Sequence, residues 1–376
     1  MEEQLIQHLK DLVSINSVNP DLSKLGQGEK QIAEFVHNHF TKLNIESKVH
    51  IIKDDRCNTT AFLKGNNPEK ILLLNGHLDT VGIEDMKDPF ILKNDGDHLY
   101  GRGTYDMLAG CAIQMALATF FSKNPCPISL AFTFVADEEN MSIGMEYLIE
   151  NYLPTLPSKP FLGIFMEPTE EAIGISHKGY SWYELKIEGL AAHGSRPEQG
   201  INAIFPMEHA LSELSKINKE LLDEEPHPHL GHATLHPGMI SGGTAKSVIA
   251  SESNIKWERR TLPGESKQKL DDELQRVISA VLKAPGDHKV TGSQVYNRPP
   301  NEVKNYSTIE PLRKLAGNKD YNGMSYWADS ALATMAGIPS ILFGPAGHGA
   351  HAIDEWVSKQ SMLNCYKTMK KFILEL

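Results

Sequence analysis

Short apolar runs alternate with longer segments of helical period in two stretches of the chain, residues 1–175 and 296–376. A short apolar run bounded by turn or polar residues is typical of a buried strand. Four such runs are expected to be strands: Ile71–Leu74, Ile128–Val135, Leu162–Phe165 and Ser340–Phe343. Met107–Phe121, which is rich in small and apolar residues, is expected to be a helix packed on their sheet. The alternation predicts one α/β layered domain built from both stretches.

Residues 176–295, which lie between these stretches, follow a different pattern. Tyr180–Ile187 and Ser253–Arg259 alternate apolar and polar residues, as strands with one solvated face do. Asn202–Ile217 and Ser266–Leu282 carry apolar residues at helical spacing. The sequence therefore predicts a smaller α+β domain inserted at 176–295. Two domains suit a chain of 376 residues, because a single core stops growing at roughly 250–300 residues.

Composition and charge exclude several classes of function. A formal net charge of −11, with no basic cluster to offset it, disfavours binding to nucleic acid. No run of about 18 apolar residues is present, so the sequence predicts no membrane span. The first residues are acidic, unlike the basic start of a signal peptide, and the four cysteines are scattered without CxxC spacing. We expect a cytoplasmic globular protein that acts on small molecules.

Each of the four predicted strands runs into residues that can bind metal or carry a proton. They are His77 and Asp79 after the first strand, Asp137, Glu138 and Glu139 after the second, Glu167 after the third, and His348 and His351 after the fourth. Asp106 adds a carboxylate at the turn just before the predicted helix. Ligands of open α/β sheets bind at the carboxyl ends of the strands, so these side chains are expected to converge.

The converging residue types favour a pair of zinc ions. Imidazole nitrogen and carboxylate oxygen are zinc ligands, and a carboxylate can bridge two ions about 3.5–4 Å apart. Two Zn²⁺ ions would bring a charge of about +4, which the carboxylates of Asp106, Glu139 and Glu167 and one bound hydroxide would neutralise. On chemistry alone, His348 and His351 are equal candidates for the last ligand.

The order and spacing of five motifs form the most specific signal in the chain. The motifs are His77–Val81, Gly101–Met107, Asp137–Glu139, Glu167–Thr169, and Ala350–His351 followed by Asp354 and Glu355. They resemble the dinuclear zinc family of acetylornithine deacetylase, succinyl-diaminopimelate desuccinylase, aminoacylases and several exopeptidases. The resemblance implies a zinc-exopeptidase-like mixed-sheet catalytic domain, formed by residues 1–175 and 296–376. It also implies an inserted ferredoxin-like α+β domain for dimerisation, which would close as a lid.

The resemblance also implies a role for each motif residue. Its implied ligands are Asp106, which bridges both metals, His77 and Glu167 on one ion, and Glu139 and His351 on the other. It implies that Glu138 is the catalytic carboxylate and not a ligand. Asp79 would orient the His77 ring, because a ligating imidazole needs an acceptor at its other nitrogen.

Two residues of the insertion complete the implied site. Gly189–Pro197 resembles the dimerisation motif of the family, whose histidine, here His193, reaches the active site of the partner subunit and stabilises the oxyanion. Arg260 matches the arginine of the family, which would pair with a substrate carboxylate, although a surface salt bridge is the alternative. Because His193 would act across subunits, the resemblance implies a homodimer. The chain has Ser247–Ala250 where an Asn-Val-Ile-Pro run is common in the family, so the usual substrate contact of this loop is not expected here.

The implied function is that of an amide hydrolase that removes the acyl group from an N-acyl amino acid, as acetylornithine deacetylase does in arginine biosynthesis. A zinc-activated water would attack the amide, with Glu138 as general base. Each subunit would hold two Zn²⁺ ions, for which Co²⁺ is a substitute. A dipeptidase or carboxypeptidase of the same family is the alternative, because a dipeptide presents the same amide bond. A non-catalytic metal-dependent binding protein is the alternative outside enzymology, and the presence of Glu138 argues against it.

Overall fold

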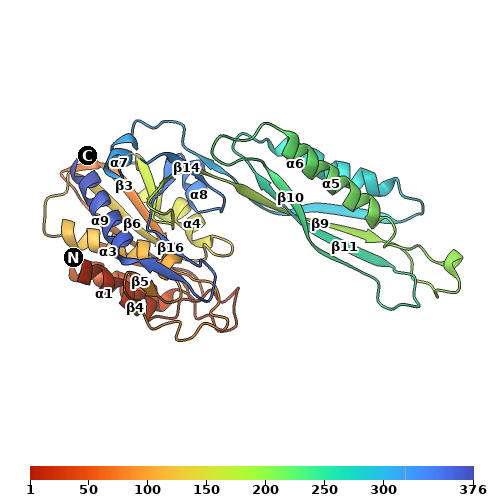
Figure 1. Ribbon diagram of the computed structural model, residues 1–376, viewed down its shortest axis with the longest axis horizontal. Coiled ribbons are helices and arrows are strands. Elements are labelled where there is room, and N and C mark those ends of the chain that lie inside the picture. The colour runs from red at the N-terminus through yellow and green to blue at the C-terminus, as the bar shows by residue number, and fades with distance from the viewer. Residues whose placement is uncertain (318) are drawn as a thin grey trace. The chain divides into compact units, whose positions relative to one another are not determined.

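The computed structural model describes residues 1–317 and 319–376, and these divide into two compact units (Figure 1). Unit 1 comprises Met1–Ile175, Val303–Gly323 and Ala328–Leu376, and unit 2 comprises Ser176–Glu302 and Met324–Trp327. The chain returns to unit 1 at Val303 and not at residue 296, because strand β12 (Lys289–Arg298) belongs to the sheet of unit 2.

The large sheet of the described residues has the order β1-β2-β6-β3-β7-β15-β8-β13, and β14 also pairs with β8. Its strands are β1 (Glu46–Lys53), β2 (Arg56–Leu63), β3 (Asn67–His77), β6 (Ile128–Val135), β7 (Leu162–Phe165), β8 (Ile173–His177), β13 (Asn301–Glu302), β14 (Tyr321–Met324) and β15 (Ser340–Leu342). The neighbours β6, β3, β7 and β15 are parallel, and they are the strands predicted from the apolar runs. The antiparallel strands β2 and β8 flank them, so the sheet is mixed, as predicted.

Helices cover the large sheet. They are α1 (Glu2–Val13), α2 (Lys30–Lys42), α3 (Ala109–Phe121), α4 (Ile143–Tyr147), α7 (Glu310–Leu315), α8 (Ser330–Met335) and α9 (Lys359–Leu374), with helical turns η2 (Leu148–Tyr152) and η3 (Leu153–Thr155) after α4. Helix α3 is buried over almost its whole length because α1 and α9 pack against it in addition to the sheet. Among the described residues, no helix is long and apolar enough to cross a membrane.

The predicted helix at Met107–Phe121 begins two residues later, at Ala109. Residues Thr104–Leu108 instead form a wide turn, η1, in which Asp106 and Met107 have non-helical backbone angles. Gly103 starts this turn with φ 76°, and a Cβ atom there would lie 2.6 Å from the Thr80 side chain. Asp106 therefore lies outside the helix, and its side chain meets residues at the carboxyl ends of the parallel strands.

A small antiparallel sheet, which the sequence analysis did not predict, joins two distant segments of unit 1. It has the order β16-β17-β5-β4, with β4 (Lys93–Asp95), β5 (His98–Tyr100), β16 (Gly347–His348) and β17 (Trp356–Ser358). Strands of two or three residues are too short to show a periodic pattern. Through the pairing of β17 with β5, the segment that carries His351 is tied to the segment that precedes Asp106.

Unit 2 follows the β-α-β-β-α-β order of a ferredoxin-like domain. Strands β9 (Gly179–Glu188), β10 (Thr234–Gly242), β11 (Glu252–Thr261) and β12 form an antiparallel sheet of order β10-β11-β9-β12, covered by α5 (Met207–Asp223) and α6 (Lys267–Leu282). Strand β9 alternates buried and more exposed residues, as predicted. Helix α5 begins at Met207 and not at Asn202, because the Asn202 side chain accepts a hydrogen bond from the Ile204 amide and Pro206 follows at the N-cap.

Candidate metal centre

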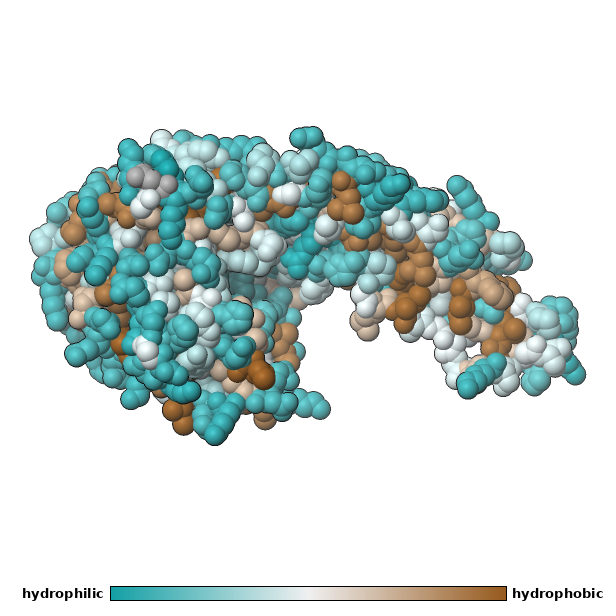
Figure 2. Space-filling view, in the orientation of Figure 1, coloured by the Kyte–Doolittle hydropathy of each residue, from teal (hydrophilic) through white to brown (hydrophobic). Residues whose placement is uncertain are grey.

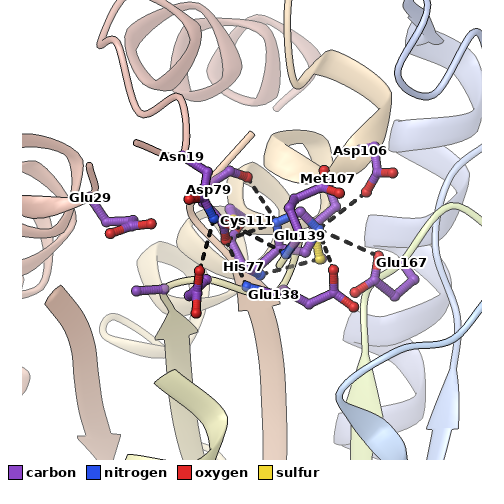
Figure 3. Close-up of polar contacts among 12 residues, drawn as sticks. Asn19, Glu29, His77, Asp79, Asp106, Met107, Cys111, Glu138, Glu139 and Glu167 are labelled. Carbon is purple, nitrogen blue, oxygen red and sulfur yellow. Dashed lines mark hydrogen bonds and ion pairs between the residues drawn. The ribbon is translucent and has the colours of Figure 1, made fainter. Parts of the chain in front are cut away.

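The predicted ligands gather where the parallel strands of unit 1 end. His77 is the last residue of β3 and pairs with Val135, the last residue of β6, while Phe165 at the end of β7 pairs with Asn75. Glu138, Glu139 and Glu167 follow within four residues of their strand ends, and Asp106 comes from η1. Figure 3 shows their carboxylates around the His77 ring.

Among the described residues, two groups of side chains are close enough to hold a metal ion, and they share Asp106. In the first group, His77 Nε2 lies 3.1 Å from Asp106 Oδ1 and 3.8 Å from Glu167 Oε2. In the second group, His351 Nε2 lies 2.9 Å from Glu139 Oε2 and 3.4 Å from Asp106 Oδ2. The two carboxylate oxygens of Asp106 thus face different groups, which is the geometry a bridging ligand requires.

The structure distinguishes His351 from His348, which are equal candidates for the last ligand on chemistry alone. His351 joins the second group, whereas His348 lies on β16 with its ring centroid 6.3 Å from that of Trp356. Glu138 belongs to neither group, and its Oε2 lies 4.0 Å from His77 Nε2. A carboxylate beside a ligand group but outside it can exchange a proton with a molecule bound there.

Burial and crowding make the carboxylates of the centre reluctant to ionise. Burial raises the pKa of Glu138 well above its ordinary value, and the negative charge of Glu167 adds to this effect while His77 opposes it. Burial, followed by the charge of Asp106, raises the pKa of Glu139 to about 7. The pKa of Glu167 rises to about 8, also because of burial.

The pKa shifts of Asp106 and His351 have the opposite effect, because they favour the charged forms of both side chains. Burial works against the ionisation of Asp106, yet hydrogen bonds with His351 and His77 hold its pKa well below the usual range. Hydrogen bonds to Asp106 and Glu139 raise the pKa of His351 to about 10. Acidic and basic groups thus lie within contact of one another.

This donor set fits a pair of divalent cations. When ionised, Asp106, Glu138, Glu139 and Glu167 would carry more negative charge than two imidazolium groups can offset, and bound cations would favour this ionised form. Among the described residues, the Oε1 atom of Glu139 is buried without a hydrogen-bond partner, although buried polar atoms usually have one. Nitrogen and oxygen donors together suit zinc.

Asp79 touches both His77 and the turn that carries Glu138. Its Oδ1 and Oδ2 accept hydrogen bonds from the backbone amides of Glu138 and Glu139, at 3.1 and 3.2 Å. The backbone carbonyl of Asp79, 2.9 Å away, is the closer acceptor for His77 Nδ1, whose distance to the carboxylate is 3.6 Å. A proton on Nδ1 leaves the lone pair of a neutral imidazole on Nε2, the atom that faces Asp106.

Behind Asp79 lies a buried polar network that the sequence analysis missed. The side-chain amide of Asn19 donates to Asp79 and Asp137, at 2.9 Å each. Arg56 donates to Asp137 at 2.7 Å and to Glu29 at 2.8 Å. These residues come from separate loops and strands, and no spacing in the sequence marks them as partners.

Asp329, at the N-terminus of α8, is a further residue of unit 1 that the sequence analysis missed. Its side chain is fully buried, and its charge contributes to the raised pKa values of Glu138 and Glu167. A single aspartate before a short helix gives no sequence signal beyond that of an ordinary helix cap.

The remaining two predicted site residues lie in unit 2. His193 is exposed, and its Nδ1 lies 2.7 Å from the Ser195 hydroxyl oxygen. Arg260 on β11 is half-buried, donates to Glu258 at 2.6 Å, and lies over the Tyr180 ring at 5.3 Å. The salt bridge that the sequence left open as an alternative for Arg260 is therefore present.

A mixed α/β sheet whose parallel strands deliver two overlapping ligand groups beside a further carboxylate is the arrangement of a metal-dependent hydrolase. The chain belongs to peptidase family M20/M25/M40, whose family model matches residues 73–375. It is therefore a metal-dependent hydrolase of amide bonds, and the predicted family and enzyme class are confirmed.

Relatives of known name cover nearly the whole chain. An acetylornithine deacetylase from Buchnera aphidicola subsp. Schizaphis graminum is 27% identical over 379 residues, which cover 98% of this chain and 97% of that protein. A tripeptidase from Staphylococcus aureus has a TM-score of 0.78 at 19% identity, with 99% and 98% of the two chains covered. A dinuclear metal binding peptidase of the M20 family from Bacillus subtilis has a TM-score of 0.74 at 14% identity, with 100% and 98% covered. These structural similarities confirm the predicted fold.

Proposed function

We propose that this protein removes the acyl group from an N-acyl amino acid, with two divalent metal ions, as an acetylornithine deacetylase-type enzyme. The position of Asp106 between the two ligand groups, with Glu138 beside them, is the observation that carries the proposal. Similarity over nearly the full length to a protein named acetylornithine deacetylase supports deacylation as the reaction.

Five side chains would hold the two ions. Asp106 would contribute one oxygen to each, His77 and Glu167 would complete the first position, and Glu139 and His351 the second. Zinc is the proposed metal and cobalt a substitute, because both accept nitrogen and oxygen ligands. When bound, such a pair polarises a carbonyl group and lowers the pKa of water toward about 7.

Glu138 is the proposed general base. Its carboxylate accepts a proton from the water that attacks the amide carbonyl, and returns this proton to the nitrogen of the departing amine. The carbon–nitrogen bond breaks as the amine leaves, so the products are a free carboxylate and a free amino acid. Burial raises the pKa of Glu138 above its ordinary value, which supports this role because a higher pKa makes the carboxylate a stronger base.

Unit 2 would contribute to substrate binding. Arg260 would exchange its contact with Glu258 for the carboxylate of the substrate, in a bidentate pair. His193 would donate a hydrogen bond to the oxyanion in the active site of a partner subunit.

The surface of unit 2 supports a homodimer. Strand β10 is an edge strand, which leaves backbone groups open to another strand. Met239 and Ile240 on β10, together with Ile204 and Phe205, are exposed apolar residues of this unit. Figure 2 shows apolar side chains gathered on the surface of unit 2.

The Glu138→Gln variant tests the mechanism. We expect two metal ions per chain to remain bound, while turnover falls by roughly 10²–10⁴-fold. This is the usual contribution of general acid–base catalysis. Metal analysis and steady-state kinetics on one preparation give both numbers. The matched control is Glu34→Gln, at an exposed carboxylate on α2, which should leave both unchanged. Full activity in Glu138→Gln would remove Glu138 from the mechanism.

A substrate panel tests the reaction class. Rates on N-acetylornithine, N-acetylmethionine and N-succinyl-diaminopimelate are expected to exceed those on dipeptides. Faster cleavage of dipeptides would identify a dipeptidase or carboxypeptidase with the same metal centre. Absence of any hydrolysis with zinc or cobalt supplied would point to a binding protein.

A further inference from the structure

Glu355 is a buried carboxylate next to the metal centre that belongs to neither ligand group. Its side chain is 1% exposed, and both of its oxygens are used. Oε1 accepts hydrogen bonds from the backbone amides of Tyr105 and Asp106, at 2.8 and 3.1 Å. Oε2 accepts from the Gly103 amide at 2.9 Å and from Arg102 Nη1 at 2.8 Å. One carboxylate thus accepts hydrogen bonds from three backbone amides at the start of the turn that presents Asp106.

Glu355 also lies close in the chain to His351, the exposed ligand of the second group. Glu355 follows His351 by four residues and directly precedes β17, whose Trp356 pairs with Tyr100 of β5. The loop that carries His351 and the turn that carries Asp106 are therefore tied together by the small sheet and by the hydrogen bonds of Glu355. Arg102 pairs with Glu355, so the contact adds hydrogen bonds with little net charge.

We propose that Glu355 is a positioning residue that aligns Asp106 with His351 and thereby forms the second metal position. This inference rests on the proposed function, because it assigns a support to one of the two ions. The distance of 3.4 Å from His351 Nε2 to Asp106 Oδ2 is the geometry that Glu355 maintains. The first position also uses Asp106 but is less dependent on Glu355, because strand pairing of β3 with β6 and β7 holds its other two ligands, His77 and the segment leading to Glu167.

The Glu355→Gln variant tests the proposal. Glutamine keeps the shape of the side chain but replaces one acceptor oxygen with an NH₂ group, which cannot accept from the backbone amides of the turn. We expect the affinity for the more weakly bound ion to fall about 10–100-fold, the usual effect of losing a group that orients a metal ligand. The affinity for the tighter ion should change less, and excess metal should restore turnover. Calorimetric titration of the metal-free protein with Zn²⁺ measures both affinities.

A matched control separates positioning from general loss of stability. Glu273 is also a buried carboxylate paired with an arginine, Arg259, in unit 2. Glu273→Gln should lower the melting temperature and leave both metal affinities unchanged. The proposal is overturned if Glu355→Gln binds both ions as the wild type does, or if Glu273→Gln weakens the second ion equally.

A second variant and the metal content of the wild-type protein complete the test. Should Glu355→Gln fail to fold, Glu355→Asp keeps both oxygens but withdraws them by one methylene, and an unchanged second affinity in that variant would overturn the proposal. A wild-type protein that binds fewer than two ions would overturn the proposed function itself. Two ions in the wild type with no effect of Glu355→Gln would overturn only the inference.

Discussion

The two proposed ion positions use the same kinds of ligand but are built on different supports. His77 closes strand β3, Glu167 follows β7, and their side chains are 1% and 5% exposed. His351 lies in the loop between β16 and β17, its side chain is 55% exposed, and its φ is 66°. A ligand at the end of a paired strand is held by the whole sheet, whereas a loop ligand depends on a few hydrogen bonds. We therefore expect the first position to bind its ion more tightly.

The change with the largest expected effect removes the residue that the two positions share. Asp106→Asn replaces an anionic oxygen with an amide nitrogen that cannot bind a cation. Both affinities should fall by more than about 10²-fold, beyond the usual effect of losing an orienting group, and turnover should be lost with them. Metal titration and kinetics measure this, with the exposed Asp85→Asn as control. Unchanged affinity for both ions would show that Asp106 is not a ligand.

Removing the loop histidine should break only one of the two positions. His351→Ala is expected to weaken the second ion about 100-fold, because a ligand is lost, while the first ion stays bound. His348→Ala is the matched control, since His348 is a neighbouring exposed imidazole outside the ligand groups. Metal content after dialysis reports both variants. Equal loss of both ions in His351→Ala would contradict the difference between the positions.

A smaller effect is expected at Asp79, which supports the turn of Glu138 and also lies near His77. Asp79→Asn puts an NH₂ group where one oxygen accepts from the amide of Glu138 or Glu139. Turnover should fall roughly 10–100-fold with both ions retained, because Glu138 is displaced while the Asp79 carbonyl still holds His77 Nδ1. Kinetics and metal analysis distinguish the two roles. Selective loss of the first ion would show that the carboxylate acts through the imidazole.

The difference between the two ion positions also explains which parts of the site could be predicted from the sequence. Strands β3, β6 and β7 were predicted from their apolar runs, and the residues at their ends were proposed as ligands, because buried parallel strands carry a strong signal. The support of the second position was not predicted. Glu355 stands beside Trp356 in a polar loop, and nothing in that pattern shows that its carboxylate is buried under the turn of Asp106. Partners such as Asn19 and Arg56 lie far from Asp137 in the chain, so only the fold reveals them.

The smallest expected effect is on stability, and it follows from the charges that the metal ions would balance. In the metal-free protein the pKa values of Glu139 and Glu167 are about 7 and 8, above the ordinary value of 4.5, so the folded state binds these protons more tightly than the unfolded state. Their contribution to stability is complete below pH 4.5 and is lost as the pH rises through 7 and 8. His351, with a pKa raised from 6.5 to about 10, changes stability in the same direction at higher pH.

The melting temperature of the metal-free protein should therefore fall between pH 5 and pH 8, by on the order of 5 °C. Saturating zinc should flatten this dependence, because bound cations favour the ionised carboxylates. Thermal unfolding with and without a chelator, at a series of pH values, measures both curves. His351→Ala should not abolish this fall, because Glu167 keeps its raised pKa and the loss of the His351 hydrogen bond raises the pKa of Glu139 further. A melting temperature that rises with pH in the metal-free protein would mean that these carboxylates are not crowded as the structure shows.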